Sequence, residues 1–214
     1  MRVVPASSMT GLTALLALLA ALAGTVGLGI AGWVTGIGCG MIGSVLLARA
    51  LAHHGAARLG PADRVTLTRA VLVGGIAALT ADSVSRPVSV LALVTLAAVA
   101  LLLDGVDGWI ARRTSTASER GARFDLEVDA FLILALSGYV ARSVGLWVLL
   151  IGLARYAFIA AGWRLPWLRE PTAPPRRWCK VVAAIQGVVL TVVAAGLVPP
   201  DLGMAAVAVA LALL

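Results

Sequence analysis

Charged residues are scarce in this sequence. Only 13% of its 214 residues are Asp, Glu, Lys or Arg, whereas 61% are hydrophobic. Soluble domains usually carry about 25% charged residues, so too few polar side chains remain here to cover a surface in water. The scarcity excludes an ordinary soluble domain and predicts that membrane lipids are the solvent of most of the chain.

Cysteine and acidic residues are also few. Cys39 and Cys179 are too far apart for a disulfide framework or zinc-ligand spacing, and we interpret both as apolar filler. Ten acidic residues stand against 17 basic ones, which gives a net charge of +7. The basic residues lie between apolar runs rather than on one polar face, so we expect no nucleic-acid partner. The cytoplasmic loops of membrane proteins carry such a positive excess.

Long apolar runs predict an all-α integral membrane protein. A helix needs roughly 20 apolar residues to cross the hydrocarbon core, and helices satisfy their own backbone groups in lipid. Eight runs predict about 8 membrane helices: 11–34, 36–51, 66–82, 88–103, 124–141, 145–163, 180–197 and 203–214. The last run stops after 12 residues, so we expect either a truncated C-terminus or partial insertion.

Residues 1–52 admit two interpretations. A basic start, a long apolar stretch and small residues at 21–23 fit a cleavable signal peptide followed by one span. Apolar sequence continues to Trp33, however, which favours a helical hairpin that turns near 35–36.

Basic residues predict the orientation of the helices. The segments 49–69, 104–123 and 164–180 hold 13 of the 17 Lys and Arg residues. Because such residues gather in cytoplasmic loops, we expect all three segments on the cytoplasmic side of a multi-pass protein. Abundant Ala, Arg and Val with little Lys is typical of a GC-rich bacterial genome, which predicts a bacterial plasma membrane.

Six of the ten acidic residues fall within 104–129. Asp104 and Asp107 are three residues apart, and Asp125 and Asp129 are four apart at the start of the next run. Each pair shares a helix face, and a short turn between the helices brings the two faces together. Carboxylates at membrane depth are costly unless paired or metal-bound. The cluster therefore predicts Mg²⁺ or Mn²⁺, as two ions of the kind that clamp phosphoryl oxygens, and no organic cofactor.

The acids belong to a longer signature, D-x-x-D-G-x-x-A-R-x8-G-x-x-x-D-x-x-x-D. Its eight fixed positions are Asp104, Asp107, Gly108, Ala111, Arg112, Gly121, Asp125 and Asp129. This pattern resembles the signature of the CDP-alcohol phosphotransferases. The resemblance implies a six-helix membrane core with the signature on its second and third helices, here 88–112 and 122–141. The expected parts are then an N-terminal membrane hairpin, 1–52, and a transmembrane core, 53–214.

The resemblance also implies an activity. Members displace CMP from a CDP-linked lipid donor, usually CDP-diacylglycerol, with the hydroxyl of a second substrate, in phospholipid biosynthesis and as homodimers. The implied metal ligands are Asp104, Asp107, Asp125 and Asp129, with Asp129 also the catalytic base. A weaker similarity of 63–69 to N-x-x-T-L-x-R adds Thr66 to the nucleotide site. The implied nucleotide-binding residues are Thr66, Asp104, Gly108, Ala111, Arg112 and Gly121.

The acceptor is predicted from basic residues. Arg155 lies inside an apolar run, which is costly without an anionic partner. With Arg123 and Lys180 it could form a pocket for a phosphorylated alcohol such as glycerol 3-phosphate or an inositol phosphate. Lys180 and Gln186 are similar to residues of phosphatidylglycerophosphate synthases, but 178–183 lacks the second lysine and the threonine of those enzymes.

Two other classes of protein use intramembrane carboxylates. Prenyltransferases bind a diphosphate donor through two separated aspartate clusters, and cation transporters commonly have two related halves. This chain has one cluster, and transport gives Arg112 no role. Both interpretations remain as alternatives.

Overall fold

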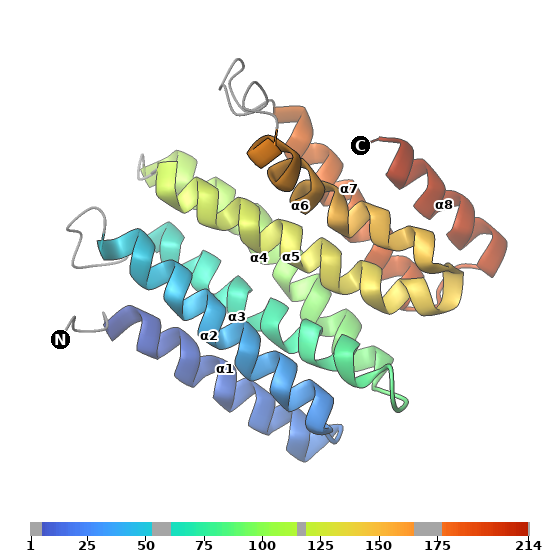
Figure 1. Cartoon of the computed structure of the whole chain (residues 1–214), viewed down its shortest axis with the longest axis horizontal. Coiled ribbons are helices and arrows are strands. Elements are labelled where there is room, and N and C mark those ends of the chain that lie inside the picture. The colour runs from blue at the N-terminus through green and yellow to red at the C-terminus, as the bar shows by residue number, and fades with distance from the viewer. Residues whose placement is uncertain (1–5, 53–60, 115–118, 165–176, 214) are drawn as a thin grey trace. The chain divides into compact units, whose positions relative to one another are not determined.

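The computed structural model describes the backbone of residues 6–52, 61–114, 119–164 and 177–213, and the side chains of 9–45, 64–106, 124–162, 164 and 180–213. The described residues form eight α-helices, one short 3-10 turn and no strand, which confirms the all-helical class (Figure 1). The elements are α1 (Ala6–Thr25), α2 (Ile30–Ala52), α3 (Pro61–Asp82), α4 (Val90–Thr114), α5 (Glu119–Val144), η1 (Leu146–Val148), α6 (Leu149–Arg164), α7 (Arg177–Ala194) and α8 (Pro200–Ala212).

The chain divides into two compact units, Met1–Val128 and Asp129–Leu214, with α5 continuing from one into the other. In the first unit α3 is the central helix, because it packs against α1, α2 and α4 (Figure 1). Every residue from Val73 to Leu79 is buried. A helix that is apolar and buried all round is the expected centre of such a bundle.

The hairpin of α1 and α2 turns at 26–29, so the prediction of a turn near 35–36 is wrong. Gly27 adopts a φ of 70°, a conformation that only glycine reaches without strain. The N–H of Gly29 donates to Oδ2 of Asp82 at 2.9 Å, which ties the turn to the end of α3. Gly36 instead lies within α2, where a Cβ would come within 2.7 Å of Leu19. That glycine serves close helix packing rather than a turn.

The second unit joins the rest of α5 to α6, α7 and α8. A Cβ at Gly152 of α6 would lie 2.6 Å from the Cα of Leu134 in α5, so these two helices approach closely. Gln186 is buried on α7, and its Nε2 donates to the carbonyl of Ala210 on α8 at 3.1 Å. Packing and one buried hydrogen bond therefore hold this unit together.

Outward faces of the helices are apolar. Ile30, Leu91, Leu102 and Leu146 are each more than 70% exposed, and soluble monomers rarely expose extended apolar surface. Within the described part of the chain, one helical stretch, Arg64–Asp82, is long and apolar enough to cross a membrane, and six further apolar stretches are shorter. The number of membrane helices therefore remains a prediction.

Candidate active site

Three of the predicted acidic residues come together in the structure. Asp104 lies on α4, and Asp125 and Asp129 lie one turn apart near the start of α5. Each offers a carboxylate oxygen, and these three oxygens lie within 4.8 Å of one another. Asp125 is buried, whereas Asp104 and Asp129 are half-buried. The cluster thus combines a sheltered carboxylate with two that a ligand can reach.

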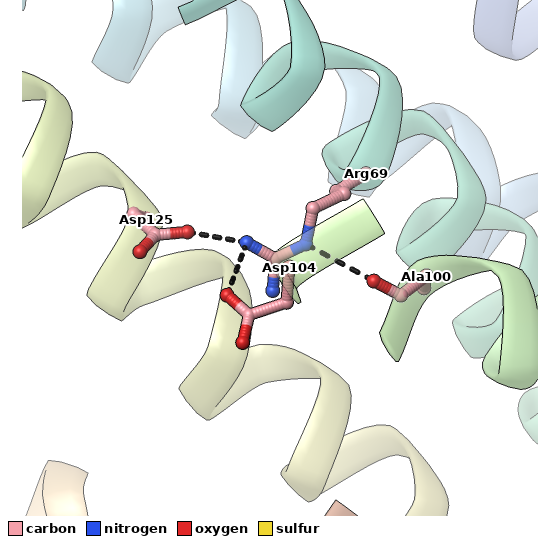
Figure 2. Close-up of polar contacts among 4 residues, drawn as sticks. All are labelled: Arg69, Ala100, Asp104 and Asp125. Carbon is pink, nitrogen blue, oxygen red and sulfur yellow. Dashed lines mark hydrogen bonds and ion pairs between the residues drawn. The ribbon is translucent and has the colours of Figure 1, made fainter. Parts of the chain in front are cut away.

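A buried arginine lies among these acids. The side chain of Arg69, on α3, is fully buried, and its Nη1 pairs with Oδ1 of Asp104 at 3.1 Å and with Oδ1 of Asp125. Its Nε donates to the carbonyl of Ala100, one turn before Asp104 on α4, at 3.2 Å. Figure 2 shows the guanidinium between the two carboxylates, with Ala100 on its other side. One side chain therefore joins three helices at the cluster.

Other residues of the signature can be placed only by their backbone. Asp107, Gly108, Ala111 and Arg112 lie on the last turns of α4, where their side chains fall outside the described residues. Gly121 and Arg123 lie in the first turns of α5, and their surroundings are likewise outside that part of the structure. Their roles in binding metal, nucleotide or acceptor therefore stay predictions.

Two small features flank the cluster. Thr66 is 2% exposed and lies one turn before Arg69 on α3, at the same end of the helix as the acids. Gly105 follows Asp104 directly, and a Cβ built there would meet no described atom within 4 Å. Helix packing among the described residues therefore does not require a glycine at this position.

The predicted acceptor residues that can be described lie in the second unit. Arg155 is half-buried in the middle of α6, and Lys180 is exposed in the first turn of α7. Gln186 turns toward α8 and holds the backbone there. The Nε2 group of Gln186 is therefore engaged with α8, which gives this residue a structural role in the chain.

The donor atoms fit a hard divalent cation. All three clustered ligands are carboxylates, and oxygen donors suit Mg²⁺ and Mn²⁺ better than softer metals. A positive charge is already drawn to this cluster, since Arg69 pairs with two of the three acids. The cluster thus has the charge and the ligand type that such an ion requires.

An all-helical frame with a carboxylate cluster at the adjoining ends of two helices suits a metal-dependent transferase. The sequence profile of the CDP-alcohol phosphatidyltransferases matches residues 59–214, so the chain belongs to this family. Its members are divalent-cation-dependent integral membrane proteins that transfer substituted phosphate groups from CDP-alcohols. No significant match was found among curated proteins or among solved structures. Membership favours the transferase over the prenyltransferase and transporter alternatives.

Sequence reasoning missed Arg69 as a site residue. It counted this arginine only among the positive charges of the segment 49–69, although the residue ends the stretch similar to N-x-x-T-L-x-R. That similarity was used for Thr66 alone. The last position of the N-x-x-T-L-x-R pattern, which Arg69 matches, was the feature of the sequence that pointed to this residue.

Proposed function

We propose that the protein transfers a phosphatidyl group from a CDP-diacylglycerol-like donor to a small alcohol, with release of CMP, in phospholipid biosynthesis. Family membership supports the reaction class. The observation that carries the proposal is the cluster of Asp104, Asp125 and Asp129, because a diphosphate donor needs concentrated cationic neutralisation and this cluster is suited to hold the cations.

The proposed metal ligands are Asp104, Asp107, Asp125 and Asp129. Two Mg²⁺ or Mn²⁺ ions bound there would neutralise the diphosphate of the donor and the charge on departing CMP. Thr66, Gly108, Ala111, Arg112 and Gly121, together with Asp104, form the proposed nucleotide pocket. The exposed, open surroundings of Gly105 support close approach of a ligand beside this pocket.

The chemical step is an attack of the acceptor hydroxyl on the β-phosphorus of the donor. A new bond forms between that oxygen and phosphorus, and the bond to the bridging oxygen breaks, so CMP leaves with the bonding electrons. The hydroxyl proton passes to the carboxylate of Asp129, the proposed general base. Asp129 is half-buried and one turn from buried Asp125, so it is the more accessible of the two clustered acids on α5.

The acceptor is proposed to be phosphorylated, as glycerol 3-phosphate or an inositol phosphate. Arg123, Arg155 and Lys180 are the proposed contacts for its phosphate. Arg155 supports this best, because it places a half-buried positive charge inside an apolar helix, where an anionic group is favoured.

We further propose a bacterial plasma-membrane homodimer, with 1–52 as a hairpin added to the core 53–214 and the site facing the cytoplasm. The family profile begins at residue 59, close to that boundary. The C-terminal half of α4 and the start of α5 carry the clustered acids, and the adjoining segments are rich in arginine. This supports the cytoplasmic orientation.

The experiment is an assay of CMP release by the purified chain in detergent, with CDP-diacylglycerol and Mg²⁺ or Mn²⁺. Glycerol 3-phosphate, inositol 1-phosphate, inositol, serine and no acceptor are compared, and Asp129→Asn is the inactive control. We expect metal-dependent CMP release with one phosphorylated acceptor, abolished in the control. Folded protein that releases no CMP with any acceptor, and binds no CDP, would refute the proposal.

A further inference from the structure

Arg69 occupies an unusual position for a residue of a cation-binding cluster. Its guanidinium is fully buried, and one nitrogen, Nη1, pairs with carboxylates on two different helices. A buried charge is strongly unfavourable unless it is neutralised by a partner. Arg69 and the acids therefore neutralise one another when no metal ion is present.

The guanidinium is also held in place independently of the acids. Its Nε donates to the carbonyl of Ala100 at 3.2 Å, so the group is anchored to the backbone of α4 one turn before Asp104. From that anchor it reaches Asp125 on α5 (Figure 2). Arg69, on α3, therefore fixes the distance between two predicted metal ligands that lie on the other two helices, α4 and α5.

We propose that Arg69 is an internal counter-ion of the metal site, and that a divalent cation binds by displacing it from Asp104 and Asp125. Both cations are drawn to the carboxylates of Asp104 and Asp125, and two positive charges held by the same pair of side chains repel each other. Binding of one must therefore weaken the hold of the other, and the coupling is reciprocal. Arg69 keeps the empty cluster folded and lowers its affinity for the ion. This inference rests on the proposed metal site.

The test measures metal binding rather than turnover. Purified wild type, Arg69→Gln, Arg69→Lys and Asp125→Asn are titrated with Mn²⁺ in detergent, and free Mn²⁺ is followed by its electron paramagnetic resonance signal. Arg86→Gln is the matched control. Arg86 also pairs with a buried aspartate, Asp82, through Nε at 2.8 Å, but at the other end of α3.

We expect Arg69→Gln to bind Mn²⁺ about tenfold more tightly than wild type. Removing a unit charge about 5 Å from a divalent ion has at least this effect, even in the dielectric of water. The same variant should unfold at a lower temperature without metal and regain stability with Mn²⁺. Arg69→Lys, which keeps the charge, and Arg86→Gln should both bind Mn²⁺ with wild-type affinity.

Equal or weaker Mn²⁺ binding by Arg69→Gln would overturn the inference, because the arginine would then support the metal-bound state. If Arg69→Gln does not fold, the Mn²⁺ affinity of Arg69→Lys provides the test of the inference. Affinity within about threefold of wild type supports the charge-based account, and a loss of tenfold or more overturns it. Failure of wild type itself to bind Mn²⁺ would instead remove the proposed metal site, which distinguishes the two failures.

Discussion

Replacing Asp82 by alanine should detach the α1–α2 turn from the end of α3. Asp82 is 1% exposed, and its Oδ2 accepts hydrogen bonds from the N–H of Gly29 at 2.9 Å and from Nε of Arg86 at 2.8 Å. The carboxylate is therefore the polar link between the N-terminal hairpin and the central helix. No apolar side chain could satisfy the N–H of Gly29 in its place.

The size of the effect follows from these two contacts. The N–H of Gly29 is part-buried, and leaving such a group without a partner costs about 1–3 kcal/mol, the upper figure applying to full burial. The ion pair with Arg86 adds less than a fully buried pair would, because the side chain of Arg86 is 39% exposed. We therefore expect Asp82→Ala to lower the free energy of unfolding by about 2–4 kcal/mol. In a chain of this length that corresponds to a fall in Tm of roughly 5–12 °C.

A second substitution separates the polar link from general damage. A Cβ at Gly29 would lie 2.5 Å from Oδ1 of Asp82, so Gly29→Ala alone should destabilise the protein by about 1–3 kcal/mol. In the double variant the clashing oxygens are gone, and the added methyl group should cost little. The two losses should therefore be clearly non-additive.

Thermal unfolding of the four proteins in detergent, followed by circular dichroism, measures this coupling. CMP release per folded molecule is the control for the active site. Asp82 and Arg69 are 13 residues apart on α3, about 20 Å along the helix, so activity should not change. Additive losses of stability would refute the link as described, and a selective loss of activity would refute its separation from the site.

Three other predictions concern the site and its frame. Gly105→Ala should leave stability unchanged or raise it by up to about 1 kcal/mol, because the added Cβ meets no described atom. The same variant should be stabilised less by CDP than wild type in thermal-shift assays. Equal stabilisation by CDP would contradict the binding of a ligand near Gly105. Chelation of divalent cations with EDTA should abolish CMP release, and Asp125→Asn should reduce it about 100-fold or more; persistent activity in EDTA would exclude the metal site. Gln186→Leu should lower stability by about 1 kcal/mol, since it removes the hydrogen bond to Ala210. Acceptor preference should stay the same, and a switched acceptor would contradict a purely structural role for Gln186.

The helices were predictable because lipid leaves a chain few alternatives. Apart from the run 11–34, which the turn at 26–29 divides, each long apolar run became a helix, and the helices that carry the acids, α4 and α5, extend past the apolar runs into the signature. The turn of the first hairpin was not predictable in the same way. Glycines occur at 24, 27, 29, 32 and 36, so composition alone could not choose among them. The choice depends on Asp82, 53 residues away, which binds the N–H of Gly29.

The acidic cluster was predictable because helical spacing is local. Three- and four-residue intervals place acids on one face, and a short connection brings consecutive helices together. Gln186 shows the limit of such reasoning. Its similarity to a residue of phosphatidylglycerophosphate synthases did not reveal that its amide bonds to the backbone of α8. Whether an intramembrane polar group serves a ligand or a neighbouring helix depends on packing between distant segments.

The place of Arg69 at the acidic cluster was overlooked because a general rule on positive charge already accounted for this arginine. An arginine near a cytoplasmic helix end needs no explanation beyond orientation in the membrane, so its charge drew no attention. The burial of Arg69 needs a further explanation, because an arginine that only sets the orientation of a helix in the membrane would keep contact with solvent. Its partners Asp104 and Asp125 are 35 and 56 residues away in sequence, so no local pattern could reveal them. The cluster is thus a set of acids around a cation of the chain's own, and by the proposal above a metal ion bound there would compete with that cation for the carboxylates of Asp104 and Asp125.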